Sequence, residues 1–431
     1  MALKILITGD IHIGKKSSSV KQDTDESATK STWAKIVDYA IMNDVAVLAL
    51  TGDVVDQDNR YFEAIGPLQT GFEKLKTAGI DIFMVSGNHD FDVLSQLVDS
   101  NSYENVHLLG KNGTWEMKKF AKNGEYIQFV GWSFPKRHFN EDPLVTFDIN
   151  GIDSSSTTIG LLHGDVGVPD SNYAPIDLNN FVNHSVNVWM LGHIHKPQIL
   201  RAAEPLVYYP GSPHALSSKE TGIHGPVLLT VHSPTSIEKV HIPLSPVRYE
   251  TIAIDITDQI TEADVRNKLT STLYTDAKSR IMELEKVSFL IYDIHLVGQH
   301  IKIKELETWV KPIIDAYDQE IDAIETRISV RKVVFNVQPK VDNLKELALE
   351  SSPAGILANT IIALNNGETT DFSEKLLLQW KSIHSDIKQA PVYQPLNTSE
   401  RFNLEENHNA EKYVLNECNR ILTELIEQQN Q

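Results

Sequence analysis

The chain has 431 residues, a length that suits two or three domains better than one. Hydrophobic residues make up 41% of it and charged residues 23%, a balance that supplies a sizeable core and excludes a wholly disordered or fibrous protein. Acidic side chains outnumber basic ones by 58 to 39, and the net charge of −19 argues against strong, sequence-independent binding of DNA by the whole surface.

The first 246 residues alternate short apolar runs with amphipathic segments. The runs that we predict as buried strands are residues 4–8, 45–51, 81–86, 157–162 and 186–191. Helices are predicted at 32–42 and 60–77, and a hairpin at 115–132. Strands interleaved with helices predict a layered α/β structure for this part of the chain.

A smaller α/β unit is predicted at residues 247–340. Its strands are expected at 251–256, 287–297 and 328–337, with helices at 262–284 and 304–318 between them. We expect this unit to cap the functional site.

Beyond residue 340 the strand pattern ends, and residues 341–431 are predicted to form a helical tail. The expected helices are 341–349, 356–364, 374–390 and 411–428, with a Pro/Asn-rich linker at 391–403. An apolar stripe at helical spacing near the C-terminus needs a surface to pack on; it consists of Val414, Cys418, Ile421, Leu422, Leu425 and Ile426. Spacing alone favours packing within the chain and docking on a partner about equally.

Cys418 is the only cysteine, which excludes an intrachain disulfide and a thiolate metal cluster. The apolar start of the chain is too short for a secretory signal, and no later run approaches the length of a membrane-spanning helix. We therefore expect a cytoplasmic protein without a membrane partner.

Metal-type ligands follow each of the five predicted strands. The motifs are Gly9-Asp10-Ile11-His12, Gly52-Asp53, Gly87-Asn88-His89-Asp90, His163-Gly164 and Gly192-His193-Ile194-His195. In open α/β sheets, ligands gather beyond the carboxyl ends of the strands, so we expect these side chains to converge although they are far apart in sequence. Glycine beside them lets the backbone turn sharply.

These donors can be counted against two cations. The seven are Asp10, His12, Asp53, Asn88, His163, His193 and His195. If one carboxylate bridges, each ion has four protein ligands, and a place remains for a phosphate oxygen, as two-metal hydrolysis requires. Oxygen and imidazole donors suit manganese, iron or zinc, and manganese is our first expectation. One histidine alone would more often be structural, but the ordered set predicts a metal site.

The motifs resemble those of the calcineurin-like metallophosphoesterases, and longer strings are similar to the SbcD and YhaO-like nuclease branch. The strings are Gly52-Asp53-Val54-Val55-Asp56, Leu161-Leu162-His163-Gly164, Tyr173-Ala174-Pro175, Leu191-Gly192-His193-Ile194-His195-Lys196-Pro197 and Tyr209-Pro210-Gly211-Ser212. The resemblance covers about residues 1–245 and implies a sandwich of two sheets flanked by helices.

The resemblance also implies roles for the site residues. Asp10, His12, Asp53 and His195 would hold one metal, and Asp53, Asn88, His163 and His193 the other. Asp53 would bridge the two ions, with a hydroxide between them as nucleophile. His89 would contact the scissile phosphate rather than a metal; the alternative is a hydrogen bond that orients Asp10 or Asn88.

As a function, the resemblance implies a metal-dependent DNA exonuclease or endonuclease subunit of SbcD type, acting with an SbcC-type coiled-coil ATPase in DNA repair or defence. The helical tail would bind that partner, and a homodimer is possible. An alternative is a two-metal phosphatase or phosphodiesterase for small nucleotides or phosphoproteins. A third reading, a DNA-bridging scaffold with a vestigial site, is disfavoured because the ligand set is intact.

Three positions depart from the family pattern. Asp56 stands where some nucleases of the family have a histidine, three residues after the bridging aspartate, which leaves the proton donor for the leaving group open. Asp165 adds a carboxylate without an assigned role. The segment 213–216 lacks the arginine that we associate with relatives, so a contact that positions DNA is expected to be weaker there.

Overall fold

The computed structural model describes residues 2–21, 24–58, 63–101, 103–321, 325–341, 343–389 and 406–429. The predicted linker at 391–403 lies outside these residues. The chain forms two compact units: Met1–Thr251 with Ala277–Asp293 and Tyr317–Lys332, and Ile252–Asp276 with Ile294–Ala316 and Val333–Gln431. The division into three parts at residues 246 and 340 stays a prediction.

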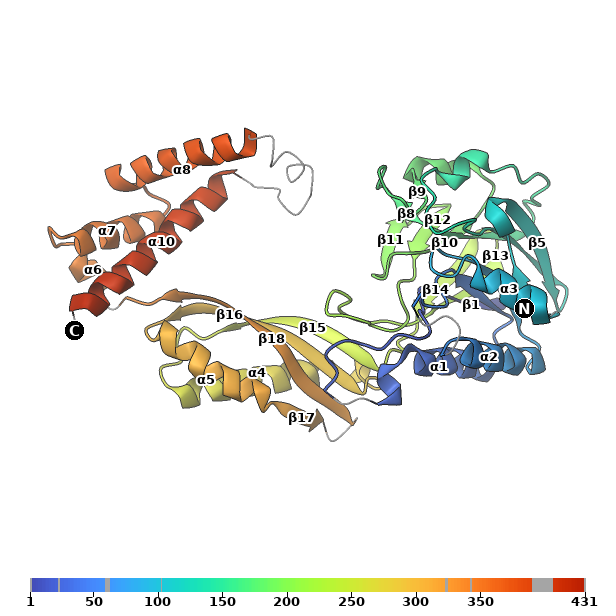
Figure 1. Ribbon diagram of the computed structural model, residues 1–431, viewed down its shortest axis with the longest axis horizontal. Helices are drawn as coiled ribbons and strands as arrows, with labels where there is room; N and C mark the ends of the chain where they lie inside the picture. The colour runs from blue at the N-terminus through green and yellow to red at the C-terminus, as the bar shows by residue number, and fades with distance from the viewer. Residues whose placement is uncertain are drawn as a thin grey trace. The chain divides into compact units, whose positions relative to one another are not determined.

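The first unit contains a six-stranded sheet in the order β14-β13-β1-β2-β3-β4. Figure 1 labels β1, β13 and β14 of this sheet. Its strands are β1 (Leu3–Thr8), β2 (Val47–Thr51), β3 (Asp81–Val85), β4 (Val106–Leu108), β13 (Val227–Ser233) and β14 (Ser236–His241). Strands β1 to β4 run parallel, whereas β13 is antiparallel to both β1 and β14. The carboxyl ends of β1, β2 and β3 therefore lie at one edge.

A second six-stranded sheet has the order β11-β12-β10-β7-β6-β5. Its strands are β5 (Trp115–Lys122), β6 (Glu125–Trp132), β7 (Thr157–His163), β10 (Val188–Gly192), β11 (Gln198–Arg201) and β12 (Leu206–Tyr209). Strands β6, β7, β10 and β12 are parallel, and β5 and β11 are antiparallel edge strands. The predicted two-sheet sandwich is confirmed.

Alternation along the strands explains why the two sheets stack. Leu48 and Leu50 of β2 belong to a buried cluster with Trp33 and Phe72, from helices α1 (Thr29–Met42) and α2 (Ile65–Thr77). Val47 and Ala49 point to the other face, where side chains from both sheets form a second cluster. Because both faces are covered, the strands are apolar almost throughout. Helix α3 (Val93–Asn101) follows β3.

A third sheet has the order β15-β16-β18-β17. It contains β15 (Val247–Asp255), β16 (Phe289–His300), β17 (Asp318–Ile321) and β18 (Thr326–Pro339), with helices α4 (Glu262–Ser279) and α5 (Ile303–Asp315) in the connections. Two predicted helix ends were wrong: α4 stops before residue 284, and residue 318 begins β17. This edge strand carries three exposed polar residues, so it has no apolar alternation to detect.

The tail contains α6 (Leu344–Leu347), α7 (Pro353–Asn365), α8 (Asp371–Gln389) and α10 (Glu406–Gln429). Helix α10 packs on α7 and α8 (Figure 1). Val414, Cys418 and Leu422 of the predicted stripe are buried in this contact, whereas Ile421 remains 39% exposed. Most of the stripe is therefore used within the chain. Among the described helices, none combines the length and apolar character needed to cross a bilayer.

Candidate metal centre

The predicted donors lie at the carboxyl ends of β1, β2, β3, β7 and β10: His163 is the last residue of β7, and the others lie in the loops that follow their strands. Backbone hydrogen bonds join the first two loops, from the Asp10 N–H to Gly52 O (2.9 Å) and from the His12 N–H to Asp53 O (3.0 Å). The loops of the two sheets are also joined, since the His193 N–H donates to the Asp10 carboxylate at 2.9 and 3.0 Å. The strand ends thus meet at a common place.

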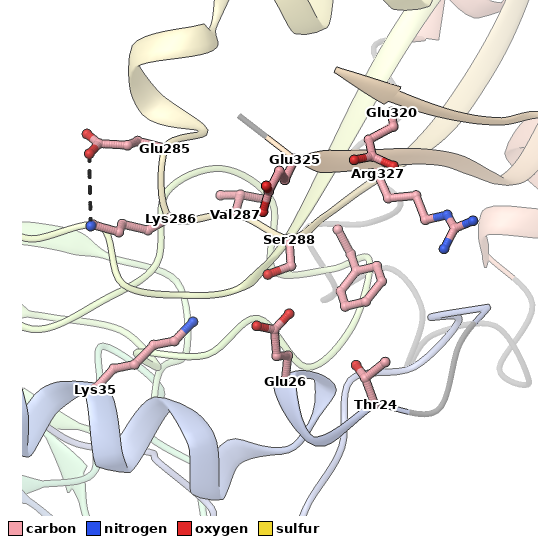
Figure 2. A pocket seen from close by; sticks show the side chains of 11 residues that line it. Thr24, Glu26, Lys35, Glu285, Lys286, Val287, Ser288, Glu320, Glu325 and Arg327 are labelled. Atoms are coloured by element: carbon pink, nitrogen blue, oxygen red, sulfur yellow. Dashed lines mark ion pairs between the residues drawn. The ribbon is translucent and has the colours of Figure 1, made fainter. Parts of the chain in front are cut away.

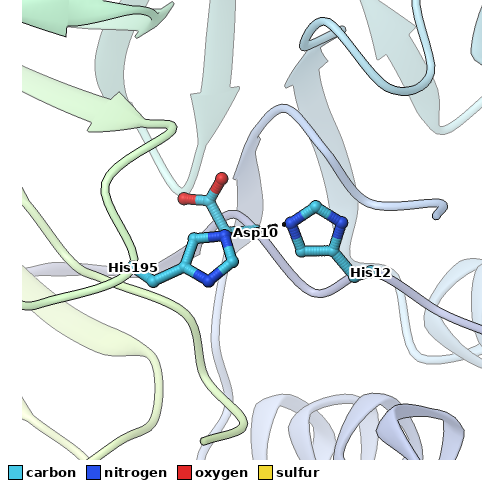
Figure 3. Close-up of side chains that lie close together, drawn as sticks. All are labelled: Asp10, His12 and His195. Carbon is cyan, nitrogen blue, oxygen red and sulfur yellow. Dashed lines mark hydrogen bonds between the residues drawn. The ribbon is translucent and has the colours of Figure 1, made fainter. Parts of the chain in front are cut away.

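One cluster consists of Asp10, His12 and His195 (Figure 3). The Nε2 atoms of His12 and His195 lie 3.1 Å apart and face each other. Nδ1 of His195 donates to Glu220 Oε1 at 3.2 Å, so its Nε2 is left with a lone pair. Two imidazole nitrogens and a carboxylate around one point are a donor set that fits a divalent cation.

A second cluster consists of Asp53, His163 and His193. Nδ1 of the fully buried His163 donates to the Thr51 carbonyl at 3.0 Å, so Nε2 carries the lone pair. This nitrogen faces Asn88 Oδ1 at 3.1 Å and Asp53 Oδ2 at 3.4 Å. Three acceptors that face one another repel unless a positive charge lies among them, and a metal ion fits that requirement.

Charge effects agree with this arrangement. Burial by itself disfavours the charged imidazole of His163, but the nearby Asp53 carboxylate outweighs it and raises the pKa of His163 to about 9. The pKa of Asp53 lies well below its usual range although burial opposes this, because His163 and His12 lie close. A positive charge is therefore favoured beside Asp53, whether a proton or a metal ion carries it.

His89 and Asp56 form a third group with His12. Oδ1 of the buried Asp56 lies 2.7 Å from Lys15 Nζ, 3.4 Å from His12 Nδ1 and 3.5 Å from His89 Nδ1. His89 is 27% exposed, and its Nε2 lies 4.0 Å from Asp53 Oδ2. One imidazole nitrogen thus faces Asp56 while the other faces the metal centre.

Asp165 lies beside His193, with its Oδ1 3.3 Å from His193 Nε2. It also accepts a hydrogen bond from the Ser171 hydroxyl. Burial alone would raise the pKa of Asp165, but the contact with His193 lowers it. The carboxylate that had no assigned role therefore contacts a predicted ligand.

The backbone is strained at four of the predicted metal ligands. Asp10, His12, Asp53 and His193 have φ angles of 50°, 49°, 48° and 101°, which non-glycine residues rarely adopt. A Cβ on Gly87 would lie 2.2 Å from Asp53 Oδ1, so a larger residue there would displace the carboxylate. Backbone strain of this kind is common at functional sites.

Sequence reasoning missed two contributors. Glu220 orients His195 and accepts hydrogen bonds from Ser212 Oγ (3.1 Å) and Leu216 N (2.8 Å). Asp90 accepts the N–H groups of Gly87 (2.8 Å) and Val54 (2.7 Å), which links two ligand loops; burial and the charge of Asp53 raise its pKa to about 7. Asp90 lies in a quoted motif, whereas Glu220 carries no local signal.

The first compact unit, which contains the metal centre, also contains a cavity of about 500 Å³ that is separate from the donor clusters. Figure 2 shows Lys35 and Lys286 among several acidic side chains, with an ion pair of 3.9 Å between Lys286 and Glu285. None of the predicted metal ligands lines the cavity.

Residues 3–197 match the family model for calcineurin-like phosphoesterases. The chain is 31% identical over 238 residues to the uncharacterized metallophosphoesterase YhaO of Bacillus subtilis (strain 168); the alignment covers 53% of this chain and 56% of that protein, about half of each. A dimetal phosphatase from Danio rerio is similar with 13% identity over 55% of this chain and 98% of its own, at a TM-score of 0.35. The calcineurin-like phosphoesterase YfkN from Bacillus subtilis has 14% identity over 64% and 98%, at a TM-score of 0.33.

Proposed function

We propose that this chain, whose residues 3–197 match the family model for calcineurin-like phosphoesterases, is a two-metal phosphodiesterase that cleaves DNA. The observation that carries the proposal is the pair of facing donor clusters, in which the Nε2 atoms of His12 and His195 lie 3.1 Å apart and that of His163 faces two oxygen acceptors. Such a set of nitrogen and oxygen donors fits a divalent cation.

The residues would divide as follows. Asp10, His12 and His195 would hold one ion, and Asn88, His163 and His193 would hold the other; Asp53, which lies with His163 and His193, is proposed as the ligand that both ions share. Two bound divalent ions, manganese being the first expectation, would neutralise charge on the phosphate and acidify the attacking water. The positive field that they bring is local, so it operates despite the net charge of −19.

His89 is the group that this chain offers for proton transfer. Its Nδ1 faces the Asp56 carboxylate at 3.5 Å, and its Nε2 lies 4.0 Å from Asp53 Oδ2. In this proposal the Nε2–H of His89 donates its proton to the leaving oxygen as the ester bond breaks. Asp56, at the position where relatives have a histidine, thereby acts through His89.

The partner follows from the same proposal. An SbcC-type coiled-coil ATPase would bind the tail in DNA repair or defence, but on outward residues, since Val414, Cys418 and Leu422 are buried within the chain. Exposed apolar side chains of the tail that could contact a partner include Leu378 and Ile383 of α8 and Tyr413 of α10. A second copy of the chain is the other possible occupant.

The net charge of −19 favours an alternative, the hydrolysis of small nucleotides or phosphoproteins at the same metals. Purified full-length protein with Mn²⁺ separates the two when it is offered linear DNA, bis-p-nitrophenyl phosphate, cyclic nucleotides and a phosphopeptide. We expect cleavage of DNA and of the diester, lost in Asp53→Asn. Efficient hydrolysis of cyclic nucleotides or phosphopeptides with intact DNA would refute the nuclease, and full activity of metal-depleted Asp53→Asn would refute the metal centre itself.

A further inference from the structure

The loop that follows β6 carries consecutive cationic side chains. Lys136, Arg137 and His138 are all exposed. Within the part of the chain that the structure describes, the side chains of Lys136 and Arg137 have neither an ion pair nor a hydrogen bond, and Glu141, the nearest acid along the chain, pairs with neither. Two free cations side by side are notable in a chain with a net charge of −19.

Backbone contacts fix this loop beside the metal centre. The Phe139 N–H donates to Asn172 O at 2.9 Å, and the Ala174 N–H donates to Phe139 O at 2.6 Å. The same segment holds Asp165, whose N–H donates to Tyr173 O at 2.9 Å. The loop is thus anchored to the segment that places a carboxylate against His193.

Contacts between aromatic rings limit the distance between this loop and the metal centre. The ring centroid of His138 lies 5.6 Å from that of Tyr173, which lies 5.1 Å from that of His193, so the two imidazoles can be at most about 11 Å apart. One strand of a duplex rises about 3.4 Å per phosphate. The loop therefore lies within two or three nucleotides of a phosphate bound at the metals.

We infer that Lys136 and Arg137 bind backbone phosphates that flank the scissile one, so the site takes a polynucleotide strand rather than a small phosphoester. The inference rests on the proposed function and names residues that give it its substrate class. A small ester would not reach the loop, whereas a strand places a second and third negative charge there. Arginine can bind such a phosphate with two parallel hydrogen bonds, and lysine as a point charge.

The test replaces both cations, as Lys136→Ala with Arg137→Ala, in the full chain. The matched control is Lys118→Ala with Lys119→Ala, which removes the same charge from exposed positions in the middle of edge strand β5. The readout is kcat/KM for a single-stranded oligonucleotide divided by that for bis-p-nitrophenyl phosphate. We expect the ratio to fall about tenfold or more in the loop variant and to stay unchanged in the control.

Salt dependence supplies a second readout. In an Asp53→Asn background, the slope of log affinity for the oligonucleotide against log salt should decrease in magnitude by about 1.4 when two phosphate contacts are lost. The double exchange Lys136→Arg with Arg137→Lys should restore most of the ratio and the slope, because the charges return.

The outcomes are distinct. If the wild type cleaves DNA while the loop variant keeps its ratio and its slope, the inference is wrong and the proposed function stands. If the loop variant loses both activities equally, the loop supports the fold and not the substrate, which also overturns the inference. If the wild type hydrolyses the small diester but neither cleaves nor binds DNA, the proposed function fails, and the loop assignment fails with it.

Discussion

His195 shows how much of a metal ligand's behaviour comes from the group behind it. Its Nδ1 donates to Glu220 at 3.2 Å, and that carboxylate is itself held by Ser212 and the Leu216 N–H. The carboxylate fixes the ring orientation and the tautomer that leaves Nε2 free for a metal. Burial alone would lower the pKa of His195, but the bond to Glu220 and the nearby carboxylates of Asp10 and Asp53 together raise it.

We expect Glu220→Gln to weaken binding of one Mn²⁺ ion by about 10- to 100-fold. Isothermal titration of metal-depleted protein measures this directly. The control is Glu238→Gln, which alters a comparable histidine–glutamate contact, His232 to Glu238 at 3.4 Å, on an exposed strand. Equal Mn²⁺ affinity in the Glu220 variant and the control would show that Glu220 does not position a ligand.

His89 has two possible tasks, protonation of the leaving group and stabilisation of charge on the phosphate, and substrate chemistry separates them. The deoxyribose oxygen that leaves from DNA is strongly basic and needs a proton, whereas p-nitrophenolate leaves without one. We expect His89→Ala to retain both metals by elemental analysis and to lower kcat on DNA by about 10²–10⁴-fold, with a much smaller loss on bis-p-nitrophenyl phosphate. Equal losses on both substrates would assign His89 to phosphate charge instead.

At the scale of elements, the sequence predicts the central strands β1, β2, β3, β7 and β10 well because each is buried on both faces, whereas it did not predict β4, β11, β12, β13 and β14. Leu48, Leu50 and their neighbours in β2 form an uninterrupted apolar run, and the donors follow wherever such a run stops. The same pattern does not predict edge strand β17, because its exposed polar residues show no alternation with apolar ones. It does not predict the role of Glu220 either, since only the folded loop brings Glu220 to His195. The local sequence pattern therefore predicts the strand ends and the donors that follow them. The residues that orient those donors are brought close only by the tertiary structure.

His214 joins elements that are distant in the chain. Its Nε2 bonds Ser17 Oγ at 2.8 Å and its Nδ1 bonds Thr32 Oγ1 at 2.7 Å, so it ties the loop before α1 and the start of that helix to the segment after β12. The side chain is fully buried, and burial lowers its pKa from 6.5 to about 4.

This shift predicts a dependence of stability on pH. Between pH 6.5 and 4 the unfolded chain binds a proton at His214 and the folded chain does not, so the free energy of unfolding falls as the pH falls, by at most about 3 kcal/mol, and levels off below about pH 4. Urea titrations of wild type and His214→Gln at pH 7.5 and 5 measure the effect. We expect the stability difference between the two proteins to shrink at pH 5; a constant difference would contradict the pKa.

At the scale of the whole molecule, the tail has a core of its own, distinct from the sandwich clusters. Ala358 and Ile361 of α7 pack with Leu377 of α8 and with Val414 and Leu422 of α10. None of the predicted metal ligands belongs to this cluster. The tail is therefore expected to lose structure without disturbing the metal centre.

Leu422→Ala and Ile421→Ala form a matched pair that tests this independence, because Leu422 is fully buried and its neighbour Ile421 is 39% exposed. The buried change leaves a cavity and should cost about 2–5 kcal/mol locally, whereas the exposed change should cost much less. Hydrogen exchange followed by mass spectrometry should show faster exchange in α7 and α10 for Leu422→Ala alone, with Mn²⁺ affinity unchanged in both variants. A loss of Mn²⁺ binding in Leu422→Ala would show instead that the tail supports the metal centre, and an SbcC-type partner bound there could then act on catalysis through the fold itself.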